Sequence, residues 1–230
     1  FDVFTASFLD AVPLVRTGLF VVGVASVAAG GYLALRQSDV RRLLAYSSVL
    51  QMGLVVLGIA IATPAAVTAA LVLLVANAIA KGGLYAATGV LADTFGATTV
   101  DSYAGLGRDA PLTAAAVGVA LVSLVGLPPT VGFAGKWYLA VAAVDARAWV
   151  VVVVVLLSTL LSLAYAGRVV ERLYLAPAGH EVEPVATDGG GLAPVPTRDR
   201  AVAFVVVAAL ATVLVGLGSP KQELRIDQHM

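Results

Sequence analysis

Long apolar stretches separated by short polar segments dominate this chain of 230 residues. A bilayer core about 30 Å thick requires roughly 20 apolar residues when the chain crosses it as a helix. Six runs approach or exceed this length, at residues 17–35, 43–62, 66–92, 112–144, 148–167 and 201–217. No alternating ten-residue pattern typical of a membrane barrel is present. The pattern predicts an all-α, polytopic membrane helix bundle with about six transmembrane helices.

The polar segments divide the chain into five expected parts. These are an N-terminal extramembrane segment (1–16), a five-span membrane bundle (17–174), a cytoplasmic linker rich in Pro and Gly (175–200), a last transmembrane helix (201–217) and a polar tail (218–230). The chain begins with Phe1 and an acidic segment, where a signal peptide would be basic. We therefore expect a fragment of a longer protein.

The arginines in the connections predict the orientation of the spans. Arginines collect in every second connection, at Arg36, Arg41, Arg42, Arg108, Arg168, Arg172, Arg198 and Arg200. Cytoplasmic loops carry an excess of positive charge, so these connections are assigned to the cytoplasm and both termini to the outside. We expect a multi-pass protein of the cell membrane.

Composition removes several classes of function. The chain is 60% hydrophobic and 12% charged, its formal net charge is +0, and its mean hydropathy is +0.97; no basic face indicates a nucleic-acid partner. It has no cysteine, and its two histidines, His180 and His229, lie in polar segments. No metal-ligand spacing, phosphate-binding loop or nucleophile with a base is present. We expect no metal, no cofactor and no redox or hydrolytic site.

Lys81 and Lys136 are the two ionisable residues inside the apolar runs. A charge in the membrane costs on the order of 2.5–3.5 kcal/mol on insertion scales, so each lysine is a candidate functional residue. The alternative is snorkelling, in which the stem lies in lipid and the amine reaches the interface. Lysine can give up its proton, whereas arginine stays protonated, so lysine suits a proton relay.

Polar residues recur at helical spacing beside Lys81. Asn77, Lys81 and Tyr85 follow one another four residues apart, which predicts one polar helix face directed into the bundle. Two further stripes are expected, one with Ser47 and Gln51 beside Tyr46 and Ser48, and one with Ser158, Ser162 and Tyr165. Small polar residues commonly line helix contacts in lipid, so packing is the expected role of the serines and a polar path is the alternative.

The segment GLPPTVGFAGKWYL at 126–139 interrupts the fourth run. Proline removes a backbone donor and clashes with the preceding turn, so Pro128 and Pro129, with Gly126, Gly132 and Gly135, predict a broken helix. Backbone groups freed at membrane depth are tolerated where protein or a water-filled cavity satisfies them, and broken helices mark ion sites in transporters. A kink without function is the alternative.

Three segments resemble one membrane protein family. DVRRLLAYSSVLQMG (39–53), NAIAKGGLYAATG (77–89) and GLPPTVGFAGKWYL resemble, in order and approximate spacing, the antiporter-like proton-channel subunits of respiratory complex I and of Mrp-type Na⁺/H⁺ antiporters. The segment TVDSYAGLGRDAPLTAA (99–115) and the spelling GKWYL look more like the D-type subunit of the Mrp antiporters.

The resemblance implies a line of buried charges along the membrane midplane of a fourteen-helix subunit, of which this chain would be the last six helices. It implies that Lys136 occupies the charged position of the second broken helix and that Lys81 belongs to the central relay. Gln51 and Asn77 stand where some members have histidine, so water would have to bridge those points. The family's other broken helix, its buried acid and its upstream lysines have no counterpart here.

We therefore expect a subunit of a proton-translocating complex. The main interpretation is the D-type subunit of a multisubunit Na⁺/H⁺ antiporter, with other subunits, the lipid bilayer, protons and Na⁺ as partners. The first alternative is the proton-pumping membrane subunit (N, M or L type) of NADH:quinone oxidoreductase. The alternative of another class is a membrane scaffold that does not transport. Lys136 and Lys81 are the expected relay, and Asn77, Gln51 and Tyr85 the expected hydrated path.

Overall fold

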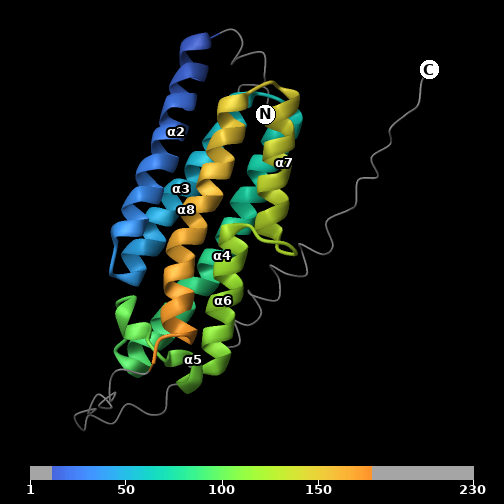
Figure 1. Ribbon diagram of the computed structural model, residues 1–230. Coiled ribbons are helices and arrows are strands. Elements are labelled where there is room, and N and C mark those ends of the chain that lie inside the picture. Colours follow the sequence, from blue (N-terminus) through green and yellow to red (C-terminus); the bar gives the residue numbers. More distant parts are fainter. Residues whose placement is uncertain (1–11, 178–230) are drawn as a thin grey trace.

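The computed structural model describes residues 12–177, which form helices and their connections without a strand. The long helices are α2 (Pro13–Arg36), α3 (Val40–Ile61), α4 (Pro64–Phe95) and α8 (Trp149–Tyr174). Between α4 and α8 lie the 3₁₀ turn η2 (Asp101–Tyr103), the short α5 (Leu106–Asp109) and the pair α6 (Pro111–Val125) and α7 (Val131–Asp145). The predicted all-α membrane bundle is confirmed (Figure 1).

Local sequence signals set where the helices begin and end. The Asp39 carboxylate accepts a hydrogen bond from the Arg42 amide (2.8 Å) and so caps the start of α3. Thr63 caps α4 in the same way, and Pro64 and Pro111 stand at the first positions of α4 and α6. Gly96 and Gly126 end α4 and α6 with φ of 64° and 86°, the left-handed conformation that glycine adopts without strain.

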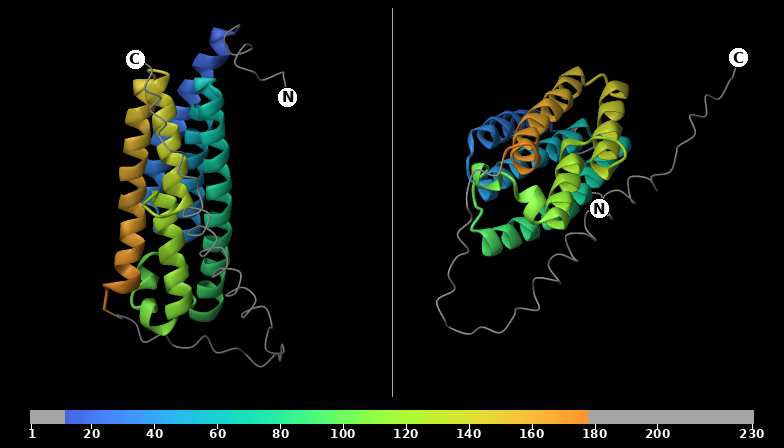
Figure 2. Two further views of the ribbon diagram at one scale, coloured as in Figure 1. Left: turned by 90° about the vertical axis from the view of Figure 1, so that its right-hand side faces the viewer. Right: turned by 60° about the horizontal axis from the view of Figure 1, so that its bottom comes forward.

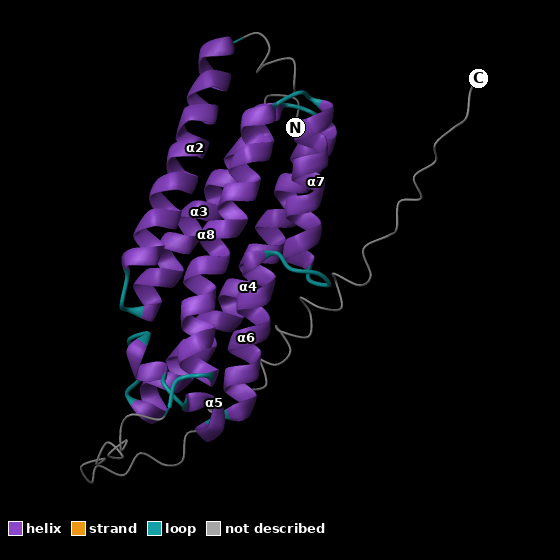
Figure 3. Ribbon diagram, in the orientation of Figure 1, coloured by secondary structure: helices purple, strands orange, loops and turns teal. Residues whose placement is uncertain are grey.

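The helices form two layers across the bundle. In one layer α2, α3 and α4 follow one another as antiparallel neighbours; in the other, α8 packs on α2 and α3, while α6 and α7 pack on α4 (Figure 2). Figure 3 shows the loops gathered at the two ends of the bundle, except for the loop between α6 and α7, which lies at mid-height. The break in the fourth span is therefore placed inside the bundle.

Glycine allows α2 and α3 to approach closely. A Cβ atom on Gly30 would lie 2.5 Å from the Leu50 amide nitrogen, which is closer than carbon and backbone nitrogen atoms can be. Such small residues let helix backbones meet where no water drives apolar surfaces together.

Within residues 12–177 the helices agree with the first five of the six expected runs, with one correction. Four helices are long and apolar enough to cross a membrane, by length and composition, and α6 and α7 together form the predicted broken span. Arg168 and Arg172, expected in the loop after residue 167, instead lie on α8, which continues to Tyr174. Arg168 donates hydrogen bonds to the carbonyls of Leu35 (2.6 Å) and Gln37, which holds its turn of the helix against the end of α2.

Several expectations fall outside the described residues. These are most of the N-terminal segment 1–16, most of the linker 175–200, the last transmembrane helix 201–217, the tail 218–230, and the histidines His180 and His229.

The connection between α4 and α6 closes the end of the bundle where the arginines collect. Its backbone pairs with the α2–α3 turn through Val40 N to Thr98 O (3.0 Å) and Val100 N to Ser38 O (2.8 Å). Arg172 of α8 adds an ion pair with Asp101 (3.3 Å). Tyr103 is fully buried beneath this connection, and burial raises the pKa of its phenol. This end of the bundle is thus covered by the connection, beneath which the uncharged Tyr103 is buried.

Candidate functional site

The break between α6 and α7 exposes the last carbonyls of α6 at mid-height in the bundle. Gly126 turns the chain away from the helix, and Pro128 and Pro129 have no amide hydrogen with which to continue it. Helix α7 begins again at Val131. A Cβ atom on Gly132 would lie 1.9 Å from the Ser123 carbonyl oxygen, so only glycine lets the start of α7 lie against the end of α6.

Lys136 binds the end of α6. It is 5% exposed, and its amine donates a hydrogen bond to the carbonyl of Val125 (2.7 Å), the last residue of α6. The adjacent carbonyl, that of Leu124, accepts from the Gln51 amide of α3 (3.0 Å). The last carbonyls of a helix lack partners within it and carry a partial negative charge. The break therefore provides the acceptors that a buried ammonium requires.

The Lys136 side chain lines part of a small cavity. It has a volume of about 10 Å³ and is lined by residues from α3, α4, α6 and α7, namely Gln51, Leu73, Ala76, Asn77, Ser123, Leu124, Gly132 and Lys136. Within residues 12–177, two buried oxygens of this lining, Asn77 Oδ1 and Ser123 Oγ, have no hydrogen-bond partner. Buried polar atoms are nearly always paired, and this volume is close to what one water requires. The lining suits a hydrated position beside Lys136.

Lys81 lies in a second buried position, between α4 and α3. It is 6% exposed, and its amine donates to the Ser47 hydroxyl and the Leu44 carbonyl of α3. The Leu44 carbonyl also accepts from the hydroxyls of Ser47 (2.8 Å) and Ser48 (3.1 Å). Neither Lys81 nor Lys136 has a carboxylate within ion-pair distance among the described residues. Both amines are therefore bound by neutral acceptors alone, and neither snorkels within this bundle.

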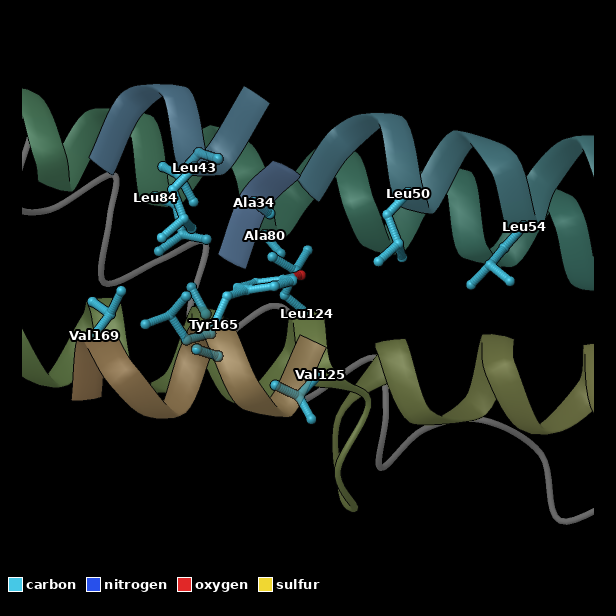
Figure 4. Packing of buried hydrophobic residues seen from close by; sticks show 14 of the residues in the cluster. Ala34, Leu43, Leu50, Leu54, Ala80, Leu84, Leu124, Val125, Tyr165 and Val169 are labelled. Carbon is cyan, nitrogen blue, oxygen red and sulfur yellow. The ribbon is translucent and has the colours of Figure 1, made fainter. Parts of the chain in front are cut away.

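A tyrosine of α8 extends the polar contacts around Lys81. The Tyr165 hydroxyl donates to Ser162 Oγ (3.3 Å) and has Ser47 as a second hydrogen-bonding neighbour. Figure 4 shows the Tyr165 ring reaching from α8 across the core toward Ala34, Ala80 and Leu124. The stripe of Ser158, Ser162 and Tyr165 is buried as expected, and Ser158 bonds its own helix at the Val155 carbonyl (2.6 Å).

The expected site residues divide into those that lie inside the bundle and one, Tyr85, that does not. Asn77, Gln51, Gly132 and Lys136 line one cavity, and Lys81 lies one turn from Asn77 on α4. Tyr85 does not face inward with them: it is 40% exposed on α4, so the expectation that the whole face points into the bundle is wrong at this residue. The buried face of α4 at this level is formed by Ala80, Leu84 and Ala87, and Tyr85 lies at its edge.

Two features of the site were not predicted from the sequence, the Ser123 hydroxyl and the backbone carbonyls that bind the lysines. Ser123 is a single hydroxyl in an apolar run, a signal that does not separate a cavity lining from a helix contact. The carbonyl acceptors of Leu44, Leu124 and Val125 belong to residues whose side chains are apolar, so residue type gives no sign of them. Over the described residues, no group of three His, Asp or Glu is placed to hold a metal ion.

Comparisons with known proteins agree with this geometry. Residues 3–162 match the family model described as NADH:quinone oxidoreductase/Mrp antiporter, TM. NADH-quinone oxidoreductase subunit N of Desulforudis audaxviator is 40% identical over 154 residues, which cover 67% of this chain and 31% of the relative. The chain thus spans about a third of the length of this curated relative.

Solved structures of two kinds of complex share the fold. A chain of the Mrp complex from Dietzia sp. superposes with a TM-score of 0.77 and 25% identity, over 92% of this chain and 46% of the other. A chain of respiratory complex I from Thermus thermophilus superposes with a TM-score of 0.75 and 27% identity, over 89% of this chain and 41% of the other.

Proposed function

Because the chain belongs to the NADH:quinone oxidoreductase/Mrp antiporter transmembrane family, we propose that it conducts protons in the membrane arm of an NADH-quinone oxidoreductase. The curated relative, an NADH-quinone oxidoreductase subunit N, favours this interpretation over the D-type subunit of an Mrp antiporter, which the segment 99–115 had suggested. Other subunits of such a complex in the cell membrane are its partners, and the chain itself carries protons rather than electrons.

One observation carries the proposal. The Lys136 amine is buried at a helix break and binds the end of α6, and its side chain lines a cavity with two unpaired oxygens. A lysine with a structural role alone would be expected to pair with a carboxylate or to extend its amine to the membrane–water interface. An amine held by neutral carbonyls can instead exist with or without its proton, because no fixed countercharge locks it in one form.

The path joins the two lysines through Asn77. Its side chain lines the cavity beside Lys136 and lies one helical turn from Lys81, a separation of about 5–6 Å between Cβ atoms. A water between Asn77 Oδ1 and Ser123 Oγ would accept a proton from one amine and donate to the other. Because protonation of one amine opposes protonation of the other, charge arriving at Lys81 would promote proton release at Lys136.

The test is proton pumping in everted vesicles that contain the full-length parent protein with its partner subunits. We expect Lys136→Ala to abolish NADH-driven acidification at normal protein levels. Lys136→Arg should fail as well, because a guanidinium does not release its proton. Arg108→Gln is the control, since Arg108 is an exposed cation remote from the break.

The alternatives give different results in the same vesicles. Acidification that depends on a Na⁺ gradient and does not depend on NADH would assign the chain to an antiporter. The Mrp superposition supports this alternative. Full pumping by Lys136→Ala would contradict the relay and leave a scaffold role, with the break as a packing kink.

A further inference from the structure

A large apolar groove opens between α2 and α8, away from both lysines. It has a volume of about 730 Å³, within the range of small-molecule sites, and is lined by Phe20, Val21, Val24, Ala25, Arg147, Ala148, Trp149 and Val150. The two helices meet further along, where a Cβ atom on Gly31 would lie 2.6 Å from Leu161 Cδ1. The groove occupies the end of the bundle opposite the arginine-rich connections, at the top of Figure 1.

The lining of this groove includes a cationic residue, Arg147. Arg147 stands in the turn between α7 and α8, and within residues 12–177 its guanidinium makes no hydrogen bond or ion pair. Its backbone is left-handed, with φ of 55°, and forms the tight turn that joins α7 to α8. Trp149, 60% exposed, lies beside it at the start of α8. Tryptophan at the end of a membrane helix is typical of the level of the lipid headgroups.

We propose that this groove binds an anionic phospholipid, with an acyl chain along α2 and α8 and the phosphate on Arg147. The apolar lining matches an acyl chain, and the guanidinium matches a phosphate, which it can bind through two parallel hydrogen bonds. Charge complementarity favours this occupant over an apolar helix of another protein, which would leave Arg147 desolvated and unpaired.

The tryptophans of the chain allow a direct test, since it has two of them, Trp137 and Trp149. The 230-residue chain with Trp137→Phe is reconstituted in bilayers containing dibrominated phosphatidylglycerol or dibrominated phosphatidylcholine, and quenching of Trp149 fluorescence is measured. One arginine near an anionic headgroup corresponds to about five-fold preference. We expect phosphatidylglycerol to be preferred by about this factor, and Arg147→Asn to remove the preference. Asparagine is chosen because it tolerates the left-handed backbone.

Two controls separate a site from general lipid contact. In Trp149→Phe, Trp137 reports on lipid at α7 and should show no preference for either headgroup. Arg108→Asn removes a charge at the other end of the bundle and should leave the preference at Trp149 unchanged. Ala25→Phe places a ring in the groove from an exposed position and should weaken quenching of Trp149 by phosphatidylglycerol.

Other results would overturn the proposal. Equal quenching by the two lipids, or a preference that survives Arg147→Asn, would mean that Arg147 does not bind the phosphate. A Trp149 that neither lipid quenches would mean that protein covers the groove, from another segment or a second copy.

Discussion

Lys81 and Lys136 are both buried amines with no carboxylate partner among residues 12–177, yet their surroundings differ. Lys81 binds within one turn of an unbroken helix, at a carbonyl already shared with two serine hydroxyls. Lys136 binds at the end of a helix, where the carbonyl has no helical partner and unpaired oxygens lie nearby. The sequence places a lysine in an apolar run in both cases; the backbone differs, with an unbroken helical turn binding Lys81 and a helix end beside a small cavity binding Lys136.

This difference in surroundings suggests that the two lysines have different roles along one proton path. A terminal carbonyl is free to exchange between the lysine and water, because no helical hydrogen bond competes for it. The Leu44 carbonyl has no such freedom. We expect Lys136 to exchange protons with water and Lys81 to pass charge within the protein. The following changes act on one position or on the link between the two.

The largest effect is expected from Gly132→Ala. Its methyl group would meet the Ser123 carbonyl oxygen at 1.9 Å, so the start of α7 must move and the Lys136 contact to Val125 is lost. We expect destabilisation of about 3 kcal/mol, the upper end of the usual cost of overpacking with backbone displacement, and loss of proton conduction. Gly89→Ala is the matched control, because a Cβ atom there meets nothing within 4 Å. Unfolding in mixed detergent measures both, and equal stability of the two variants would contradict the close contact.

Ser47→Ala should act on the Lys81 position alone. It removes a hydroxyl that accepts from the buried amine, a bond to a charged group with a net contribution of about 1.5–3 kcal/mol. Ser48→Ala is the control, since Ser48 bonds the same Leu44 carbonyl but not the lysine. If the midpoint temperature of unfolding falls equally in the two variants, the hydrogen bond between Ser47 and Lys81 does not contribute to stability.

Asn77→Asp should link the two positions. A carboxylate in the cavity would pair with Lys136 and hold its amine in the protonated form. We expect proton conduction to slow about tenfold, equivalent to about 1.4 kcal/mol, while assembly is retained. Asn77→Gln keeps the amide and serves as the control. Faster conduction in the aspartate variant would mean that Lys136 is not the group that must release a proton.

The smallest effect on stability is expected from Ser123→Ala. Its hydroxyl makes no hydrogen bond within the described residues, so its loss should change unfolding by no more than about 0.5 kcal/mol. Proton conduction should nevertheless fall, because the cavity loses a group that positions water. A marked loss of stability would instead indicate that Ser123 has a structural partner.

Much of the fold and part of the site could be predicted from the sequence. Run length and proline chemistry are local, so the first five spans and the break at Pro128 and Pro129 were predicted correctly within the described residues. Helical spacing predicted that Asn77 and Lys81 share a face, but it placed Tyr85 there too, because spacing ignores which neighbours cover each turn. The partners of the lysines are mostly backbone carbonyls of distant residues, and these depend on how helices pack.

The order of the contacts along the chain also bears on biosynthesis. The acceptors of Lys81 precede it by 34 and 37 residues, and the acceptor of Lys136 precedes it by 11. Helices α6 and α7 have 15 residues each, about 22 Å and too short to span a bilayer alone. They must therefore leave the translocon together. Lys81 then enters the lipid after the carbonyl that binds it, and Lys136 enters together with its own acceptor, so neither lysine has to cross the membrane boundary before its acceptor has been made.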